Sequence, residues 1–480
     1  MTETPRTPPP SALGARLDRL RFGRRHTVIL LALGAGWMFD SFEVQLFSNA
    51  IGPLGDHFHA SVFERDAVLA VWLGGILLGA LAGGALTDRF GRRRMFVLTL
   101  LWYAGFTVLT GLSPDLAAVY ALRFLAALGV GAEYAIVNAA IAEFMPARVR
   151  GKAAVAVMNF WPLGAILAAL LAYLLLDTFA LASATSWRYL FVLGGLLALV
   201  VLYYRRRIPE SPRWLASHGR VEEAERIVAD LESAEPAHEV RQSAVTGVLG
   251  PAPAPPPPQL PVTTALRELV RRHPGRLALG AALDLAEAFG YYGIFALLSV
   301  VVLTKVHIRT AQIPFFYILG NLGALAGGLI ASLLLDRAGR RGTVAGAYLA
   351  AAAGVGLLAW ATATGSAAWV TAAFVVSNGA ATAAWTSAYP TFTELFPTHL
   401  RGAGIGVSVS VGRIGAIVGT LLLPDLATRL GATASYLLVI GFWLIGVGAI
   451  GLYALRGGQE AAGRPLESLV PVPAPAAAGA

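Results

Sequence analysis

The chain has 480 residues, of which 56% are hydrophobic and only 14% are charged, with a mean hydropathy of +0.65. A soluble fold of this length cannot bury so much apolar surface, so we expect an integral membrane protein. Cysteine is absent, which excludes disulfides, thiolate metal sites and thiol redox chemistry.

Twelve apolar segments are long enough to cross a hydrocarbon core, which needs about 20 residues per helix. The first is too long for a removable signal peptide, so we expect it to remain as a helix. The sequence therefore predicts an all-α membrane protein with twelve transmembrane helices, at residues 27–52, 67–87, 95–112, 116–142, 152–176, 187–204, 276–303, 311–335, 343–362, 367–390, 403–424 and 433–455.

The polar segments between and around these helices have distinct compositions. Residues 1–26 precede the first helix, and residues 205–275 form a linker between the sixth and the seventh. Within the linker, apolar residues at helical spacing from Val221 to Leu231 predict an amphipathic surface helix, and a second short helix is expected after Thr263. Pro251–Pro258 reads PAPAPPPP and predicts an extended spacer. The first twelve residues and the tail 456–480 are expected to be disordered.

Basic residues gather in the loops after the second, fourth, eighth and tenth helices, which carry eleven Arg and Lys residues from Arg89 to Arg401. Short cytoplasmic loops collect such residues, so we expect these loops and both termini to be cytoplasmic, at a bacterial inner membrane. The net charge of +9 follows from this topology, so no nucleic-acid partner is expected, and the basic clusters are expected to contact anionic lipid headgroups.

The two halves of the chain repeat each other. DRFGRRR at residues 88–94 returns as DRAGRR at 336–341, and EFMPARVRG at 143–151 returns as ELFPTHLRG at 394–402, with offsets of 248 and 251 residues. A nearly constant offset of half the chain indicates two homologous halves. We expect two pseudo-symmetric six-helix bundles, over residues 27–204 and 276–455.

These repeats, together with PESPRWL at Pro209–Leu215, resemble the major facilitator superfamily. The PESPRWL motif resembles the one found in a particular branch of this superfamily. That branch contains sugar porters, organic-ion transporters, niacin-type transporters and synaptic-vesicle-2-like proteins. Sugar porters usually carry QQxSG in helix seven and PETKG after helix twelve, where this chain reads AEAFGYYG and ALRGGQE. GAEYAIVNAAIAEFMPARVRGK, FGYYGIF and YPTFTELFPTHLRGAGIG look more like the niacin and aromatic-acid symporters. The resemblance implies a transporter, not an enzyme.

No cofactor or metal is expected. All eight histidines fall in loops or at helix edges, and no GxxxxGK phosphate-binding motif is present. We expect the partners to be a small-molecule substrate, protons and membrane lipid, and the protein to be a monomer.

The resemblance implies that the repeated loops form a cytoplasmic gate. Asp88 can accept hydrogen bonds from amides at a neighbouring helix N-terminus, while arginines of the same loop reach carboxylates. Glu143 and Glu394 end the fourth and tenth helices and are positioned to pair with Arg92 and Arg340. The alternative is that these arginines have no gating role and only reflect the general excess of positive charge in cytoplasmic loops. The expected gating residues are Asp88, Arg89, Arg92, Glu143, Arg150, Asp336, Arg340, Glu394 and Arg401.

The first helix of each half carries two acids three residues apart, Asp40 with Glu43 and Asp284 with Glu287. Residues at this spacing share one helix face, and carboxylates in a membrane face the bundle interior. We expect the four to meet near the midplane and to take up and release protons. Structural hydrogen bonds or arginine pairs are the alternative, and Arg123 is a candidate partner for an acid of helix one. The proton-coupling candidates are Asp40, Glu43, Glu133, Asp284 and Glu287.

Arg413 is the deep cation of the second half. WPLGAI at 161–166 aligns with GRIGAI at 412–417, so Arg413 stands opposite Pro162. Counting about 1.5 Å per residue from Gly402, Arg413 lies roughly 16 Å deep in a core about 30 Å thick. It binds either a substrate carboxylate or, alternatively, Asp284 or Glu287. Other expected substrate-binding residues are Tyr134, Asn138, Asn159, Trp161, Tyr291, Tyr292, Asn321 and Trp385.

These features together predict a proton-coupled symporter of a small organic anion, such as an aromatic or heterocyclic carboxylate, working by alternating access. An organic-cation or drug antiporter remains open because acids outnumber bases in the bundle. A sugar or polyol porter and a transporter-like sensor are further alternatives.

Overall fold

The computed structural model describes residues 10–146, 148–178, 185–233, 262–298, 306, 313–397, 400–462 and 464. Every regular element in these ranges is helical, which confirms the all-α fold class. Eleven of the helices are long and apolar enough to cross a membrane. The twelfth, α12 (Pro274–Leu297), carries Asp284 and Glu287 within its length. Residues 1–9, the spacer at 251–258 and residues 465–480 lie outside the described ranges.

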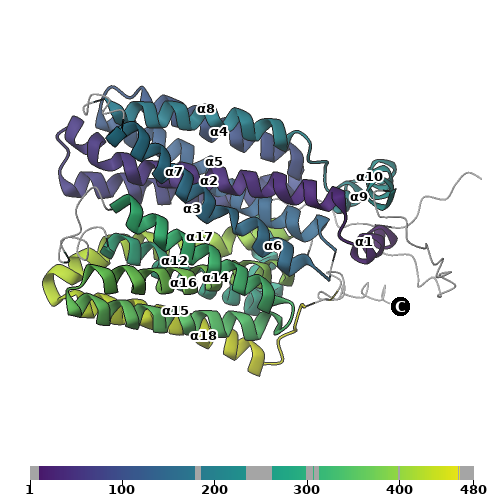
Figure 1. The fold of residues 1–480 in the computed structure, drawn as a ribbon. Helices are drawn as coiled ribbons and strands as arrows, with labels where there is room; N and C mark the ends of the chain where they lie inside the picture. Colours follow the sequence, from purple (N-terminus) through teal and green to yellow (C-terminus); the bar gives the residue numbers. More distant parts are fainter. Residues whose placement is uncertain are drawn as a thin grey trace, which may run out of the picture.

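The membrane helices form two groups that follow the two halves of the sequence, as Figure 1 shows in purple to teal and in green to yellow. The first contains α2 (Arg24–His57), α3 (Val62–Phe90), α4 (Arg92–Gly111), α5 (Leu116–Phe144), α6 (Arg150–Met158), α7 (Phe160–Ala172) and α8 (Ser186–Arg205). The second contains α12, α14 (Ile313–Leu335), α15 (Gly339–Thr364), α16 (Ala367–Leu395), α17 (Arg401–Leu430) and α18 (Ala432–Leu455).

The predicted fifth helix, 152–176, is not continuous. It breaks at Asn159 between α6 and α7, and α7 passes into a π-helical turn, η1 (Tyr173–Thr178). Pro162 lies in the first turn of α7 and has no N–H to donate to the preceding turn. A missing backbone bond of this kind is a usual cause of a break.

The two bundles meet where α3 packs against α17. Gly84 and Gly402 lie at this contact, and a Cβ on Gly402 would lie only 2.5 Å from the Gly84 carbonyl oxygen. Small residues are therefore required there for the two backbones to approach. The hydroxyl of Ser410 in α17 also donates to the Leu77 carbonyl of α3 at 2.8 Å.

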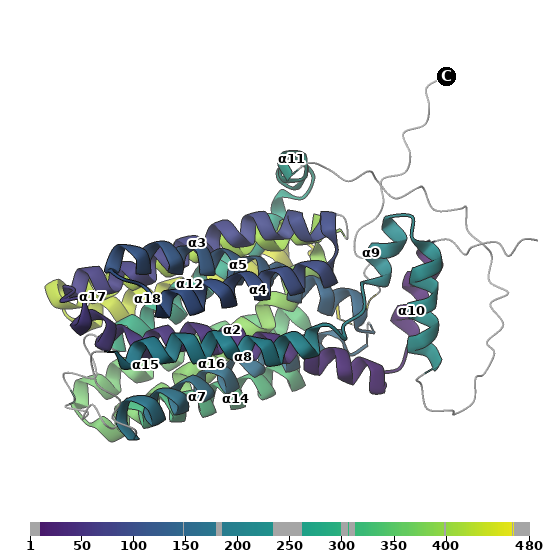
Figure 2. The ribbon, with the colours of Figure 1, turned by 90° about the horizontal axis from the view of Figure 1, so that it is seen from above.

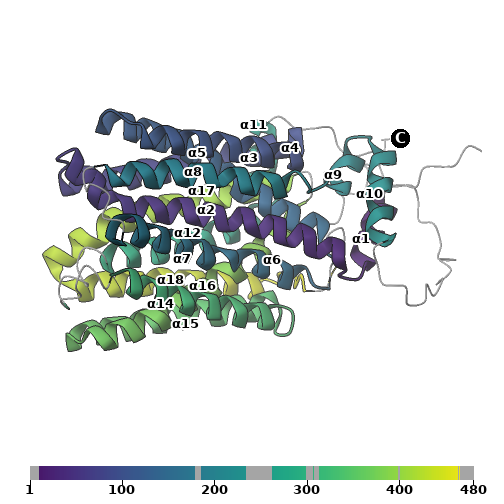
Figure 3. The same ribbon diagram turned by 45° about the horizontal axis from the view of Figure 1, so that its top comes forward.

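Short helices lie at one end of the bundles, which we call the linker end (Figures 1 and 3). They are α1 (Pro10–Arg19), α9 (Pro212–Ser217), α10 (Val221–Ser233) and α11 (Val262–Arg272). Both predicted linker helices are present, as α10 and α11. The apolar face of α10, with Val228 and Leu231 buried, packs on α1 and α9.

Three expectations about these segments were wrong. Residues 456–462 belong to the tail expected to be disordered, yet Glu460 accepts from the Arg340 N–H at 2.9 Å and the Gln459 N–H donates to the Tyr453 hydroxyl at 3.0 Å. The helix α1 begins at Pro10, within the twelve residues expected to be disordered. It is ordered because Leu13 and Leu17 are buried where α1 packs on the linker helices α9 and α10. The linker does not begin at Arg205, which is the last residue of α8 and is buried.

Candidate functional site

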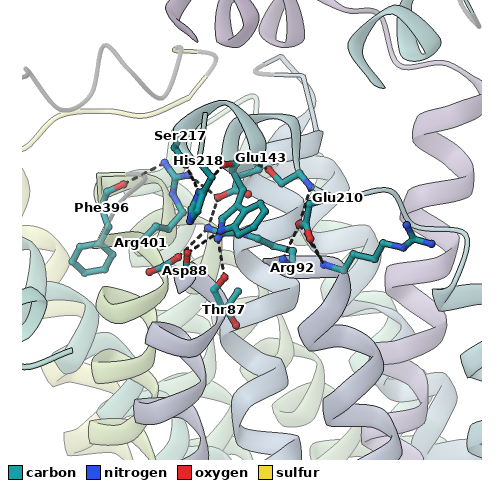
Figure 4. A network of polar contacts seen from close by, with 12 residues as sticks. Thr87, Asp88, Arg92, Glu143, Glu210, Ser217, His218, Phe396 and Arg401 are labelled. Atoms are coloured by element: carbon teal, nitrogen blue, oxygen red, sulfur yellow. Dashed lines mark hydrogen bonds and ion pairs between the residues drawn. The ribbon is translucent and has the colours of Figure 1, made fainter. Parts of the chain in front are cut away.

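At the linker end of the first bundle, Arg92 is buried among oxygen acceptors (Figure 4). Its guanidinium donates to Glu143 at 2.7 Å, to Asp88 at 3.0 Å and to the Thr87 carbonyl at 3.1 Å. Glu143 ends α5 and is fully buried. The expected pair therefore forms, as a charge-assisted contact between α4 and α5.

The second bundle repeats this arrangement. Arg340 donates to both carboxylate oxygens of Glu394, at 2.9 and 3.0 Å, and to Asp336 at 2.8 Å. This bidentate pair joins α15 to α16 as Arg92 joins α4 to α5. The repeated sequence motifs therefore form the same set of ion pairs in both bundles.

Three contacts carry the network from one bundle to the other. Arg401 lies 3.7 Å from Glu143, and the backbone N–H of Lys152 donates to Asp336 at 3.3 Å. Asp88 lies beside the start of α17, where a Cβ on Gly402 would be 2.8 Å from its carboxylate. Each loop acid therefore lies at the N-terminus of a helix in the opposite bundle, where the helix dipole favours a negative charge.

Two further acids, which the sequence reasoning missed, cap the helices that carry the loop arginines. Glu210 accepts from the N–H groups of Arg92 at 2.7 Å and Arg93 at 3.2 Å. Glu460 accepts from those of Arg340 at 2.9 Å and Arg341 at 3.3 Å. Glu210 belongs to PESPRWL, whereas Glu460 follows the ALRGGQ that differs from the sugar-porter pattern.

The two capping acids differ in their electrostatics. Burial raises the pKa of Glu210 above its usual range, and the backbone donors only partly offset this. Burial also acts to raise the pKa of Glu460, but its backbone hydrogen bonds with Arg340, Arg341 and Ala462 hold that pKa below its usual value. Glu460 is therefore the more firmly ionised of the two.

Two expected gating residues lie elsewhere. Arg89 is exposed, with its guanidinium 5.3 Å from the ring centre of Phe90, and it forms no ion pair in the described part of the chain. It has no ion pair with Glu143 or another carboxylate of the described residues, so the expectation that it reaches a gate carboxylate is wrong. Arg150 donates to Asp18 of α1 at 2.5 Å, and Arg213 lies 3.1 Å from the same carboxylate.

Within the membrane part of the first bundle, two of three buried acids are paired with arginines. Arg123 forms a buried ion pair with Glu43, as the sequence suggested, and Thr107 donates to the same carboxylate at 3.0 Å. Arg205 forms a second buried pair with Glu133. Sequence reasoning missed Arg205 because an arginine at a helix end looks like an ordinary topology signal.

Asp40 is the third acid and has no arginine within 4.0 Å among the described residues. It is fully buried and accepts a hydrogen bond from the Tyr103 hydroxyl at 2.7 Å. A buried carboxyl without a directly paired cation is the kind of group that serves in membrane proton relays.

The four acids of α2 and α12 do not meet. The charged groups that act on Asp40 are Glu133, Arg205 and Glu43, all of the first bundle, whereas Asp284 and Arg413 of the second bundle act on Glu287. Tyr134 interacts electrostatically with both Asp40 and Glu287. The expectation of one four-carboxyl cluster was wrong because aromatic side chains occupy the space between the bundles.

These side chains form an aromatic box, which we define as Trp37, Tyr134, Trp161, Trp385 and Tyr389. Trp37 of α2 lies 4.9 Å from Tyr134 and stacks on Trp385 of the second bundle at 6.1 Å between ring centres. Trp161 meets Trp385 edge-on at 5.5 Å. All five are buried. Tyr134, Trp161 and Trp385 are among the residues predicted from the sequence, whereas Trp37 and Tyr389 are not.

Arg413 lies against this box. Its guanidinium is 4.9 Å from the ring centre of Tyr134 and 5.3 Å from that of Tyr292, and it donates to the Tyr389 hydroxyl at 3.4 Å. Its Nε has no hydrogen-bond partner, and no carboxylate lies within 4.0 Å in the described part of the chain. The alternative of a direct ion pair with Asp284 or Glu287 is therefore not formed.

The remaining predicted substrate residues are less closely grouped. Tyr291 packs on Tyr292 at 5.6 Å. Asn138 and Asn321 each donate to a carbonyl one turn back in their own helix, at 2.8 and 2.9 Å. Asn159 lies at the α6–α7 break with neither side-chain polar atom bonded to a described residue. Of these three asparagines, Asn159 is therefore the one that keeps its full hydrogen-bonding capacity.

Comparison with known proteins agrees with this architecture. Niacin transporter NiaP of Acinetobacter baylyi is 28% identical over 95% of this chain and 99% of its own length. Organic cation/carnitine transporter 7 of Arabidopsis thaliana is 26% identical over 88% of this chain and 90% of its own. The proton:xylose symporter XylE has the same fold, with a TM-score of 0.73 at 20% identity over 92% of this chain and 98% of its own.

The sequence model of the Major Facilitator Superfamily matches residues 29–420, which include both repeated loops and eleven of the twelve membrane helices in full or in large part. Relatives in this family are transporters with small-molecule substrates, not enzymes. The chain is thus a multi-pass membrane transporter that belongs to the Major Facilitator Superfamily.

Proposed function

We propose that the protein is a proton-coupled symporter of a small organic anion with a flat ring, such as an aromatic or heterocyclic carboxylate. The observation that carries this proposal is Arg413, a fully buried cation between the bundles with no carboxylate within 4.0 Å in the described ranges. A buried guanidinium is costly without an anion, and it binds a carboxylate bidentately. A substrate carboxylate completes this site.

The surrounding rings suit the rest of such a substrate. Trp37 and Trp161 of the first bundle and Trp385 of the second contact one another beside Arg413, and flat ligands stack on aromatic faces. Because these rings come from both bundles, a substrate inserted among them contacts both at once. This favours a mechanism in which substrate binding is linked to the relative movement of the bundles. The similarity to a niacin transporter supports a heterocyclic carboxylate.

For the proton we propose Asp40 as the main carrier. It is buried and lacks a direct arginine partner, while Glu43 and Glu133 are held by Arg123 and Arg205. Protonation of Asp40 removes a charge from the interior of the first bundle. This lowers the free-energy cost of moving that bundle between the outward and inward states. Glu43 and Glu133 then serve as structural ion pairs, and Asp284 and Glu287 tune the charge near Arg413.

We further propose that the linker end is cytoplasmic and that the protein resides as a monomer in a bacterial inner membrane. The charge bias of the loops supports this orientation. The network of Arg92, Glu143 and Arg401 then closes the cytoplasmic side, with Asp336 and Arg340 as the matching half. With this orientation, the contacts between the bundles at the linker end support a state closed toward the cytoplasm.

Uptake into proteoliposomes tests this proposal. Radiolabelled nicotinate and benzoate are compared with the neutral analogue nicotinamide, with and without an imposed pH gradient that is acidic outside. Accumulation of the carboxylates that requires the gradient is the expected result. Uptake of the neutral analogue to the same level, or no response to the gradient, would contradict anion symport.

An organic-cation antiporter is a second candidate. Asp284 and Glu287 are buried acids, and Arg413 is the cation that acts on both, so the described residues here include more acids than bases. The similarity to an organic cation/carnitine transporter points the same way. Exchange of a quaternary ammonium ion against protons in the same vesicles, without carboxylate uptake, would favour this alternative.

A further inference from the structure

A groove opens at the linker end between the start of α12 and the end of α18, away from the aromatic box. Its volume is about 650 Å³. Figure 2 shows α11, which leads into it, separate from the group formed by α1, α9 and α10. The lining residues are Arg272, His273, Pro274, Gly275, Arg276, Ala278, Leu279, Ala282, Ala449, Leu452, Tyr453, Arg456, Gly457, Gly458 and Gln459.

The charge of the groove has one sign. Arg272, Arg276 and Arg456 line it, and no Asp or Glu is among its lining residues. Of the acids nearest in sequence, Glu268 pairs with the lining residue Arg272 at 3.1 Å, whereas Glu460 accepts from the backbone of α15. Arg276 donates to the Leu395 carbonyl at 2.8 Å, which fixes it at the inner wall. Because Arg272 is paired with Glu268, the guanidinium groups of Arg276 and Arg456 are the two that favour an anion with several acceptor oxygens here.

The groove also changes character with depth. Its basic residues lie at the start of α12 and the end of α18, while Ala278, Leu279 and Ala282 of α12 and Ala449 and Leu452 of α18 line its deeper part. Counting about 1.5 Å per residue, Ala282 lies about 9 Å further into the bundle than Arg276. A free inorganic anion would gain no favourable contact with these apolar walls. A phospholipid has both parts, because its phosphate fits the rim and its acyl chains fit the depth.

We propose that this groove binds one anionic phospholipid, with its phosphate between Arg276 and Arg456 and its acyl chains along the walls from α12 and α18. This site is separate from the proposed substrate site and does not depend on the transported compound.

Two short connections link the groove to the Arg340–Glu394 pair, so a lipid bound there would stabilise that pair. The rim residues Gly457–Gln459 lead directly to Glu460, which caps the helix of Arg340. Arg276 holds the carbonyl of Leu395, the neighbour of Glu394. A bound headgroup therefore steadies the segments on both sides of the Arg340–Glu394 pair.

Native mass spectrometry of the full-length protein in detergent tests the proposal, with phosphatidylglycerol and phosphatidylcholine of identical chains as probes. We expect one tightly retained phosphatidylglycerol in preference to phosphatidylcholine. Because an arginine near an anionic headgroup contributes about 1 kcal/mol, Arg276→Gln and Arg456→Gln should each weaken retention about fivefold. Arg429→Gln is the matched control, since Arg429 is exposed at the other end of the bundle and paired with Asp425 at 2.9 Å.

Several results would overturn the proposal. Equal retention of the two lipids would show that the groove does not select an anion, and an equal loss in Arg429→Gln would show a general charge effect. Displacement of phosphatidylglycerol by millimolar inorganic phosphate would identify a free-anion site instead. If Arg276→Gln fails to give a monodisperse protein, Arg456→Gln decides alone, because Arg456 is exposed and forms no ion pair with a described residue.

Discussion

Arg401 of the second bundle lies 3.7 Å from Glu143 of the first, and the same carboxylate oxygen accepts a hydrogen bond from Arg92 at 2.7 Å. The buried Glu143 thus interacts with an arginine of its own bundle and with an arginine of the other. This contact joins α17 of the second bundle to α5 of the first. This relationship makes the gate testable in a chain that has no cysteine of its own.

Removal of the Arg401 charge should open the linker end. In a Ser410→Cys background, where residue 410 lies at the α3–α17 contact, Arg401→Gln should increase maleimide labelling several-fold, because a bridge between bundles is lost. Arg89→Gln is the control, since Arg89 is exposed and outside the network. Equal labelling in both variants would argue against a gating role for Arg401.

Substitution of Asp40 should separate coupling from binding. Asp40→Asn keeps the size of the side chain and the hydrogen bond with Tyr103 but cannot take up a proton. We expect loss of gradient-driven accumulation with substrate counterflow retained. Accumulation that still follows the pH gradient would remove Asp40 from the coupling role.

Glu43→Gln provides the contrast in the same helix. This change leaves Arg123 buried without its ionic partner, and the loss of one member of a buried pair costs about 3–5 kcal/mol. We expect a lower melting temperature in detergent, unlike Asp40→Asn. A Glu43→Gln protein as stable as the wild type would show that this pair is not structural.

Neutralisation of Arg413 should act on charge recognition. A hydrogen bond to a charged group contributes about 1.5–3 kcal/mol, so Arg413→Gln should weaken binding of a carboxylate roughly 10- to 150-fold. A neutral analogue of the same ring should be affected little. Binding is measured by calorimetry, and Arg429→Gln again serves as the control. Equal losses for both ligands would count against carboxylate recognition.

The N-terminal helix should contribute to stability through Asp18. Asp18→Asn removes the buried partner of Arg150 and Arg213, at a cost of about 3–5 kcal/mol for a buried ion pair. Arg25→Gln breaks only the exposed Arg25–Asp230 pair, for which about 1 kcal/mol is the upper range. A clear drop in melting temperature for the first variant alone is expected. Similar melting temperatures would show that α1 does not hold the linker end.

The two capping acids should respond oppositely to pH. The pKa of Glu460 is lowered from 4.5, so its stabilisation is present above that value and is lost as the pH falls through the folded-state pKa. The pKa of Glu210 is raised, so its contribution is present below its unfolded-state pKa and is lost as the pH rises. Melting temperatures down to about pH 4 should therefore show less acid destabilisation in Glu460→Gln than in wild type, and no such relief in Glu210→Gln.

The sequence allowed some contacts of the candidate site to be predicted because they are written twice. Arg92 with Glu143 and Arg340 with Glu394 occupy equivalent positions in both halves, and both pairs form. Arg123 with Glu43 followed from the rule that a buried charge needs a partner. Glu460 could not be found in this way, because its partners lie 120 residues earlier in the chain and the surrounding residues do not match the repeat.

By itself the sequence determined the twelve helices, the two halves and the family, because hydropathy, helix length and local motifs depend on each segment alone. Only the tertiary structure decided which charges remain without a direct counter-ion. Asp40 is so placed because Glu43 and Glu133 pair with the arginines of the first bundle. Arg413 is so placed because the rings of Tyr134 and Tyr292, and no carboxylate of the described residues, lie against its guanidinium. Those outcomes depend on packing between helices distant in sequence, where a shift of a few ångströms decides whether two charges meet.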